Sequence, residues 1–114
     1  MSVVRLDALD WKIGTGQPLA VIAGLNVLED LELAITVGTE LKSICSKLGL
    51  PYIFKASFDK ANRSSIKSYR GPGFETGVPM LAEIKQELGV GICTDLHEPH
   101  QADAVAKVAD LVQL

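Results

Sequence analysis

The sequence lacks the features that mark several large classes of protein. Its only two cysteines, Cys45 and Cys93, lie far apart and neither belongs to a Cys-x-x-Cys pair, which argues against metal or redox chemistry at these thiols. No apolar run approaches the roughly 20 residues that span a bilayer, and residues 1–7 lack the pattern of a secretory signal peptide. We therefore expect a cytoplasmic protein with two buried, reduced thiols and no membrane partner.

Familiar phosphate-binding and nucleic-acid-binding patterns are also missing. Neither Gly-x-x-x-x-Gly-Lys nor Gly-x-Gly-x-x-Gly occurs, so the two common glycine-rich phosphate loops are excluded. The net charge of −3 and the isoelectric point near 5.3 argue against a nucleic-acid surface spread over the molecule. No linker, repeat or low-complexity tract divides the 114 residues, which we therefore assign to a single domain.

What the sequence does contain is positive charge gathered in one short segment. Residues 55–70 hold five of the eleven Lys and Arg residues and one acid, so the segment carries +4 while the other 98 residues sum to −7. Lys60, Asn62, Arg63 and Ser64 combine a point charge, a planar guanidinium and small donors, which suit a phosphate or a carboxylate. Lys55 follows Phe54 within an apolar run, where an unpaired ammonium is costly. The segment predicts a site for small anionic substrates, against the alternative of a solvated surface loop.

Short apolar runs alternate with amphipathic segments along the chain. The runs predict strands at 19–23, 52–56, 90–96 and 110–114 that are buried on both faces, and the amphipathic segments predict helices from an N-cap at Asp30 to Gly49, over 78–88 and over 99–108. A weaker alternation in residues 1–13 predicts a small hairpin. The order β-α-β-α-β-α-β is typical of a parallel sheet with helical crossovers, either a doubly wound open sheet or the first half of a (β/α)8 barrel.

Hydrogen-bonding side chains stand at the carboxyl ends of all four predicted strands. Asn26 follows the first, residues 55–64 follow the second, Asp95 and His97 follow the third, and Gln113 lies in the fourth. In both architectures ligands bind at this edge of the sheet. The site is therefore expected there.

Four stretches of the chain together resemble one enzyme family. They are Gly-Leu-Asn-Val-Leu-Glu at 24–29, Lys-Ala-Ser-Phe-Asp-Lys-Ala-Asn-Arg-Ser-Ser at 55–65, Ser-Tyr-Arg-Gly-Pro-Gly at 68–73 and Thr-Asp-Leu-His-Glu at 94–98. From about residue 18 to the last residue, the chain closely resembles the 3-deoxy-D-manno-octulosonate 8-phosphate synthases. The related synthases of aromatic biosynthesis carry a Lys-Pro-Arg-Thr type motif where this chain has Lys-Ala-Asn-Arg-Ser.

The resemblance implies a fold and an assembly. That family is a (β/α)8 TIM barrel, usually a homotetramer, so residues 1–114 are expected to form the N-terminal half of a single catalytic barrel, with about its first four strands and three helices. A full barrel takes about 250 residues. The 114-residue chain alone is therefore expected to be inactive.

The resemblance also implies a reaction and a set of site residues. The family condenses phosphoenolpyruvate with D-arabinose 5-phosphate, releasing inorganic phosphate, in the biosynthesis of the Kdo sugar of lipopolysaccharide. Catalytic roles are implied for Asn26, Lys60 and Asp95, with Asp95 near C2 of phosphoenolpyruvate, where water must add. The substrate-binding residues implied are Lys55, Ser57, Lys60 and Gln113 for phosphoenolpyruvate, and Asn62, Arg63 and Ser64 for the pentose phosphate.

Two positions carry finer implications. Metal-dependent members of the family have Cys where this chain has Asn26, so the resemblance implies the metal-independent class and no cofactor. His97 has three interpretations: it orients Asp95, it caps the helix after Pro99, or it acts in catalysis directly.

Two other functions remain as alternatives. One is a sister synthase of the 3-deoxy-7-phosphoheptulonate type, which uses erythrose 4-phosphate. The other is a catalytically inactive half-barrel that only binds anions. Nucleic acid is not expected as a partner of any of the three.

Overall fold

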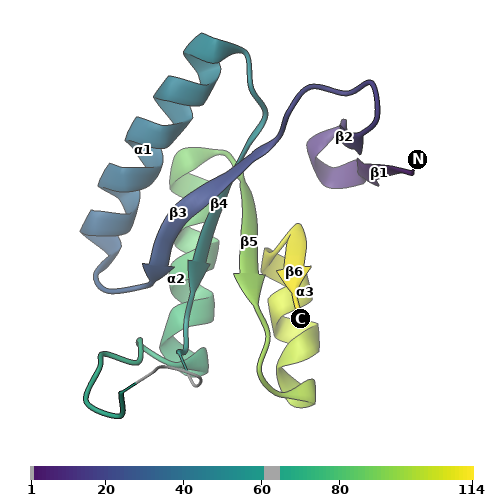
Figure 1. The fold of residues 1–114 in the computed structure, drawn as a ribbon. Coiled ribbons are helices and arrows are strands. Elements are labelled where there is room, and N and C mark those ends of the chain that lie inside the picture. Colours follow the sequence, from purple (N-terminus) through teal and green to yellow (C-terminus); the bar gives the residue numbers. More distant parts are fainter. Residues whose placement is uncertain (1, 61–64) are drawn as a thin grey trace.

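The computed structural model describes residues 2–60 and 65–114 and shows two sheets and three α-helices (Figure 1). A hairpin, β1 (Val3–Leu6) and β2 (Trp11–Gly14), comes first, with the 3-10 turn η1 (Asp7–Leu9) between its strands. The second sheet contains β3 (Val21–Val27), β4 (Tyr52–Ser57), β5 (Gly91–Asp95) and β6 (Leu111–Gln113). The helices are α1 (Leu31–Leu48), α2 (Phe74–Leu88) and α3 (Ala102–Val108), the last preceded by the 3-10 turn η2 (Pro99–Gln101). The N-terminal hairpin and the βαβ order predicted from the sequence are confirmed.

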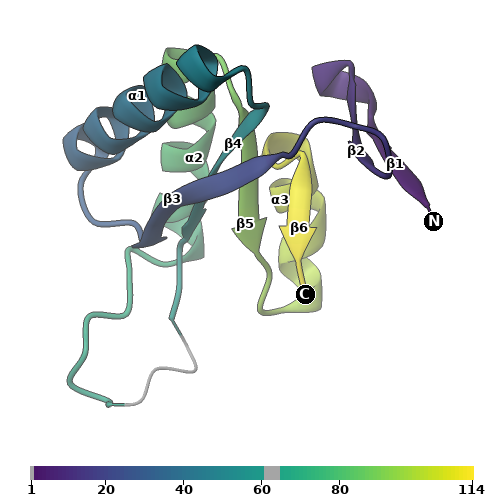
Figure 2. The ribbon, with the colours of Figure 1, turned by 45° about the horizontal axis from the view of Figure 1, so that its top comes forward.

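The larger sheet is parallel throughout and runs in sequence order, β3-β4-β5-β6. A doubly wound sheet reverses its strand order, whereas a barrel does not. No reversal occurs among the described strands, and the helices cover one face of the sheet (Figures 1 and 2). The chain is therefore an α/β protein whose sheet has the strand order of a barrel.

Local signals fix both ends of α1 where the sequence predicted them, whereas α2 begins at Phe74, four residues before the predicted start at 78. Asp30 caps α1, since its Oδ1 accepts a hydrogen bond from the Leu33 amide at 2.7 Å. Gly49 ends the same helix at φ +69°, a left-handed conformation that strains any residue with a side chain. The third predicted helix begins instead as the 3-10 turn η2 before it continues as α3.

Alternation along β4 separates the core from the polar face. Phe54 and Ala56 are buried among the helices, in the cluster that includes Leu81 of α2. Ile53 points the other way, toward a second cluster formed with the hairpin. Lys55 shares the face of Ile53 because side chains alternate along a strand. The helix side is thus the main core, and the opposite face holds the polar residues.

Two sequence predictions about the strands were wrong. The strands are not all buried on both faces: Ile22 of β3 is 44% exposed and Val112 of β6 is 40% exposed. Both strands are edges of the described sheet, so one flank of each lacks a neighbour. Asn26 lies inside β3 rather than after it, because β3 continues to Val27 past an irregular register with β4. The described helices include none that is long and apolar enough to cross a membrane.

Candidate functional site

The carboxyl ends of three adjacent strands bring the predicted polar residues together. Lys55 pairs in register with Cys93 of β5, and Asp95 of β5 pairs with Gln113 of β6. Neighbours in parallel register point to the same face, so Lys55, Asp95 and Gln113 share the face opposite the helices. The expected gathering at this edge is confirmed for Lys55, Asp95 and Gln113. Lys55 and Ser57 lie inside β4 rather than after it.

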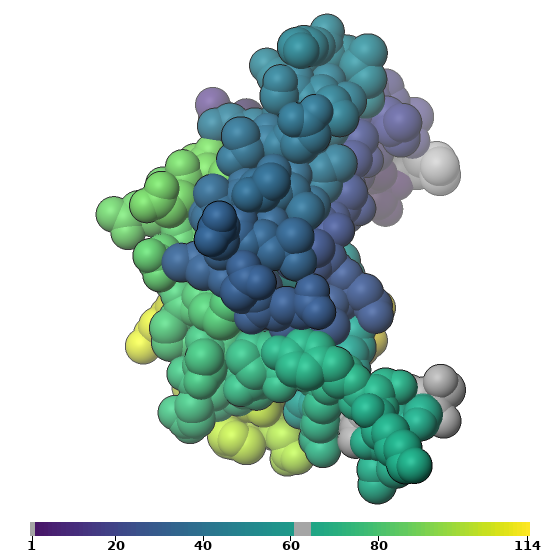
Figure 3. Space-filling model, turned by 90° about the vertical axis from the view of Figure 1, so that its left-hand side faces the viewer, coloured from purple at the N-terminus to yellow at the C-terminus, as the bar shows by residue number. Residues whose placement is uncertain are grey.

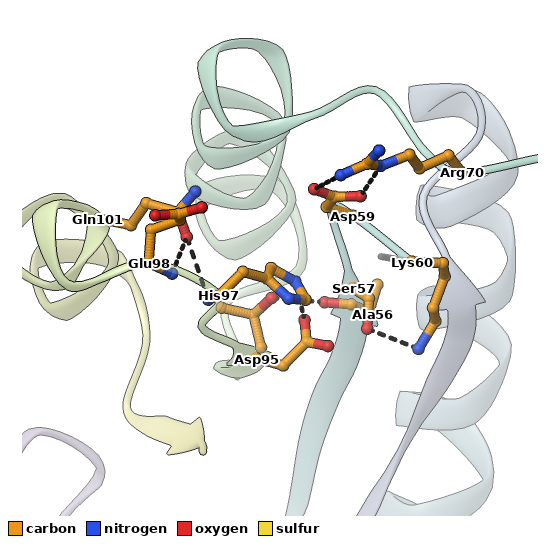
Figure 4. A network of polar contacts seen from close by, with 10 residues as sticks. Ala56, Ser57, Asp59, Lys60, Arg70, Asp95, His97, Glu98 and Gln101 are labelled. Carbon is orange, nitrogen blue, oxygen red and sulfur yellow. Dashed lines mark hydrogen bonds and ion pairs between the residues drawn. The ribbon is translucent and has the colours of Figure 1, made fainter. Parts of the chain in front are cut away.

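Lys60 turns back onto the end of β4. Its Nζ donates a hydrogen bond to Ser57 Oγ at 2.9 Å, and its backbone amide donates to the Arg70 carbonyl at 2.7 Å (Figure 4). Ser57 is fully buried, and its carbonyl accepts from the Leu28 amide at 2.9 Å. The Lys60 ammonium is therefore held at the strand end by a residue that is itself fixed by the sheet.

The segment after β4 is closed at its base. Arg70 donates from Nε and Nη2 to the two carboxylate oxygens of Asp59, at 2.6 and 3.2 Å, and the Gly73 amide donates to the Phe58 carbonyl at 2.9 Å. The hydrogen bond and the charge of Asp59 raise the pKa of Arg70. We call residues 58–60 and 70–73 the neck; beyond it, residues 65–69 extend away from the body of the molecule (Figures 2 and 3). The Arg70 guanidinium is thus paired with Asp59 and is not assigned to substrate binding.

Phe58 anchors the neck beneath the site. It is fully buried, with its ring 5.9 Å from that of Phe74 and 5.3 Å from the imidazole of His97, both edge to face. Gly71 lies against it at φ +113°, and a Cβ there would come within 2.6 Å of the Phe58 carbonyl oxygen. Position 71 therefore requires glycine. The Gly/Pro-rich sequence indicated a turn here but not this specific constraint.

Asp95 and His97 face each other across a short gap. Asp95 Oδ1 and His97 Nε2 are 3.5 Å apart, and each side chain is 19% exposed. Both atoms are buried, and neither has a hydrogen-bond partner among the described residues. Unsatisfied buried polar atoms are rare in folded proteins and often belong to catalytic or binding sites. Glu98, not His97, stands at the N-cap of η2, so the interpretation of His97 as a helix cap is wrong. His97 lies beside Asp95, and its role in orienting that carboxylate stays a prediction.

A buried thiol lies beneath the charged residues. Cys93 stands beside Lys55 in the register, and burial raises the pKa of its thiol, against the opposing effect of the Lys55 ammonium and with a further increase from Asp95. Cys45 is also buried and free, as the sequence predicted. Both thiols are therefore packing groups.

Other predicted residues are exposed to solvent or lie outside the described part of the chain. Asn26 is exposed on β3, the strand next to β4, and Gln113 is exposed on β6. Asn62, Arg63 and Ser64 lie outside the described residues. No three His, Cys, Asp or Glu side chains come together as a metal site anywhere in residues 2–60 and 65–114.

Sequence reasoning missed several residues that build the site. Phe58, Asp59 and Arg70 hold the neck together, and Gln101 binds the turn that carries His97. Only the Gly-Pro-Gly run after Arg70 signalled a constrained turn at this place.

Comparison with known proteins agrees with this geometry. Residues 2–114 match the model of the DAHP synthetase I family. A curated relative from Marinobacter nauticus, named 2-dehydro-3-deoxyphosphooctonate aldolase, is 52% identical over all of this chain and 41% of its own length. The relative of the same name from Pseudomonas paraeruginosa is 53% identical over 98% of this chain and 39% of its own length. The relative of the same name from Parasynechococcus marenigrum is 46% identical over the whole chain and 40% of its own length. The chain spans about two fifths of the length of these relatives. With its parallel sheet in sequence order and its polar strand ends, the chain belongs to the DAHP synthetase I family.

Proposed function

We propose that residues 1–114 form the N-terminal half of the (β/α)8 barrel of an octulosonate-phosphate synthase, with about its first four strands and three helices. The enzyme condenses phosphoenolpyruvate with D-arabinose 5-phosphate to give 3-deoxy-D-manno-octulosonate 8-phosphate and inorganic phosphate. The shared name of the relatives, at 46–53% identity, supports the reaction. The sequential parallel sheet with its helices on one face supports the barrel.

One observation carries the assignment of phosphoenolpyruvate. Lys55 and Lys60 stand at the end of one strand, and Lys60 is already held by the buried Ser57. We assign the phosphate and carboxylate of phosphoenolpyruvate to these two lysines, with Ser57 and Gln113 assisting. Fixed cations offset the repulsion between two anionic substrates and stabilise charge that develops on the transferred oxygens.

The pentose phosphate is assigned to the segment that the neck closes. Asn62, Arg63 and Ser64 follow Lys60 after one intervening residue. A neck held by the Asp59–Arg70 ion pair therefore keeps both ends of their segment beside the lysines assigned to phosphoenolpyruvate. We assign Asp95 to a position close to C2 of phosphoenolpyruvate, where water adds. We assign His97, whose Nε2 is 3.5 Å from Asp95 Oδ1, to the orientation of that carboxylate. Both substrates would thus meet over β4 and β5.

The proposed enzyme needs no metal. Asn26 stands where the metal-dependent class has cysteine, and a neutral amide is a weak ligand for a transition metal. Catalysis then relies on positioned side chains, with Asn26, Lys60 and Asp95 as the catalytic residues. We also propose a cytoplasmic homotetramer that acts in lipopolysaccharide biosynthesis.

Phosphate release by the product of the longest reading frame that contains this chain tests the proposal. Phosphoenolpyruvate with arabinose 5-phosphate should give phosphate, and phosphoenolpyruvate alone should not. Faster release with erythrose 4-phosphate would identify the sister synthase. Binding of phosphoenolpyruvate without turnover of either sugar would identify an inactive anion-binding protein.

A further inference from the structure

Gln101 binds the turn that carries His97. The side chain of Gln101 is buried, and its Oε1 accepts hydrogen bonds from the backbone amides of both His97 and Glu98, each at 3.1 Å (Figure 4). The backbone amide of Gln101 in turn donates to the Glu98 carbonyl at 3.0 Å. One side chain thus fixes two consecutive peptide units directly beyond β5.

These two amides lie where the sheet no longer holds the chain. Strand β5 ends at Asp95, and the Leu96 amide makes a last bond to the Gln113 carbonyl at 3.2 Å. His97 therefore begins the part of the turn whose position depends on Gln101. Because Asp95 is held by the sheet and His97 by the turn, the distance between them depends on both.

The imidazole of His97 has little freedom to compensate for a shift of its backbone. Its ring packs edge to face on Phe58 at an interplanar angle of 90°, and its Nε2 is 3.5 Å from Asp95 Oδ1. Both of these atoms are buried and make no hydrogen bond with a described residue, so their mutual position depends on packing and on the turn. A displaced turn would change that position directly.

We propose that Gln101 is a positioning residue for the reaction: by accepting from the His97 and Glu98 amides, it sets the orientation of His97 toward Asp95. The catalytic consequence rests on the proposed function, because Asp95 and His97 are assigned to the addition of water. Gln101 itself touches no reacting atom in this proposal. Its side-chain oxygen acts only through the backbone of the turn.

Three variants of the full reading-frame product separate positioning from general stabilisation. Gln101→Met keeps the length of the side chain and removes the acceptor. Gln101→Glu keeps an acceptor oxygen. Thr94→Val is the matched control, because it removes another buried hydrogen bond of β5, from Thr94 Oγ1 to the Ala56 carbonyl at 2.7 Å. Ala56 packs on the helix side of the sheet.

We expect Gln101→Met to lower kcat by about 10- to 100-fold, as small misplacements of a reacting group do, with an unchanged KM for phosphoenolpyruvate. Gln101→Glu should restore most of kcat. Thr94→Val should lose thermal stability as Gln101→Met does, without the loss of kcat. Equal loss of kcat in Gln101→Met and Thr94→Val, or no loss in Gln101→Met, would overturn the proposal.

A readout without turnover keeps the proposal separate from the proposed function. In Gln101→Met, backbone amide exchange at His97 and Glu98 should accelerate, and the imidazole ¹⁵N shifts of His97 should move, whereas those of the exposed His100 should not. If the wild type releases no phosphate with either sugar, the proposed function fails, and these shifts alone decide whether Gln101 orients His97. Unmoved His97 shifts would refute that role. Should Gln101→Met fail to fold, Gln101→Asn withdraws the same oxygen by one methylene, with the same expected results and the same refuting ones.

Discussion

The ammonium of Lys60 donates to the hydroxyl of the buried Ser57, so a basic residue of the site is held by the strand that precedes it. A hydrogen bond to a charged group contributes about 1.5–3 kcal/mol. Ser57 therefore places Lys60, and in the proposed function it also lies next to the phosphoenolpyruvate that Lys60 binds.

Ser57→Ala should raise the KM for phosphoenolpyruvate by about tenfold or more, because the Lys60 ammonium loses its fixed position. The KM for arabinose 5-phosphate should change less. Steady-state kinetics with each substrate varied in turn measures both values. Equal effects on the two substrates would contradict the assignment of Lys60 to phosphoenolpyruvate, and Thr94→Val again serves as the control.

Arg70→Gln should raise the KM for arabinose 5-phosphate more than that for phosphoenolpyruvate, because it opens the neck that holds the segment with Asn62, Arg63 and Ser64. Arg70→Lys should recover only part of the loss, since an ammonium cannot bind both carboxylate oxygens of Asp59 as the guanidinium does. Arg5→Gln is the matched control: its ion pair with Asp7, at 2.6 Å, lies on the hairpin at the other end of the sheet. A neck variant as active as Arg5→Gln would show that the neck has no part in binding.

Arg63→Ala should weaken arabinose 5-phosphate far more than phosphoenolpyruvate. Loss of a charge-assisted contact costs about 1.5–3 kcal/mol, or roughly 10- to 100-fold in affinity. Isothermal titration with each substrate measures the two changes. Equal weakening of both substrates would refute the division of labour between Arg63 and the lysines.

Activity should survive exhaustive treatment with EDTA, because the proposed metal-independent enzyme has the weakly ligating amide of Asn26 in place of a thiolate. Phosphate release before and after chelation measures this. A reversible loss, restored by manganese or zinc, would show the inference from Asn26 to be wrong. Asn26→Cys is the informative companion variant, since a metal requirement that appears only in it would identify position 26 as a ligand position.

Stability should decline in alkaline solution through two buried groups. Burial raises the pKa of Tyr52, with a further increase from Cys45, and burial also raises the pKa of Cys93. A raised pKa in the folded state means that folding favours the neutral form of each group. The stability that the neutral groups allow is complete below the pKa of the unfolded state and is lost as the pH rises through the pKa of the folded state. Urea unfolding from pH 7 to 11 should show the decline, and it should be shallower in Tyr52→Phe, which also loses about 0.5–1.5 kcal/mol at neutral pH with its bond to the Ala23 carbonyl. A parallel decline in Tyr52→Phe would exclude Tyr52 as its source.

Local signals made the helices predictable from the sequence. Contacts between distant segments were not predictable in this way. Asp30 and Gly49 fix their helix ends through bonds to residues within five positions, so the sequence contains what is needed. The packing of Phe58 on His97 joins residues 39 positions apart, and no periodicity encodes it. Asn26 was misplaced for a related reason: the irregular register with β4 extends β3, and that register is a property of the pair of strands.

Side chains of β4 alternate between the helix core and the polar face, so a change in the length of this strand is more disruptive than a change of one residue. Phe54 and Ala56 belong to the helix core, and Lys55 and Ser57 to the polar face, in strict succession. A single-residue deletion before Lys55 would exchange the two sets, placing an ammonium among the helices and a phenyl ring in the anion site, whereas a conservative substitution disturbs one side chain only. Natural variation and directed evolution in this strand should therefore proceed by replacement at fixed length, without insertions or deletions.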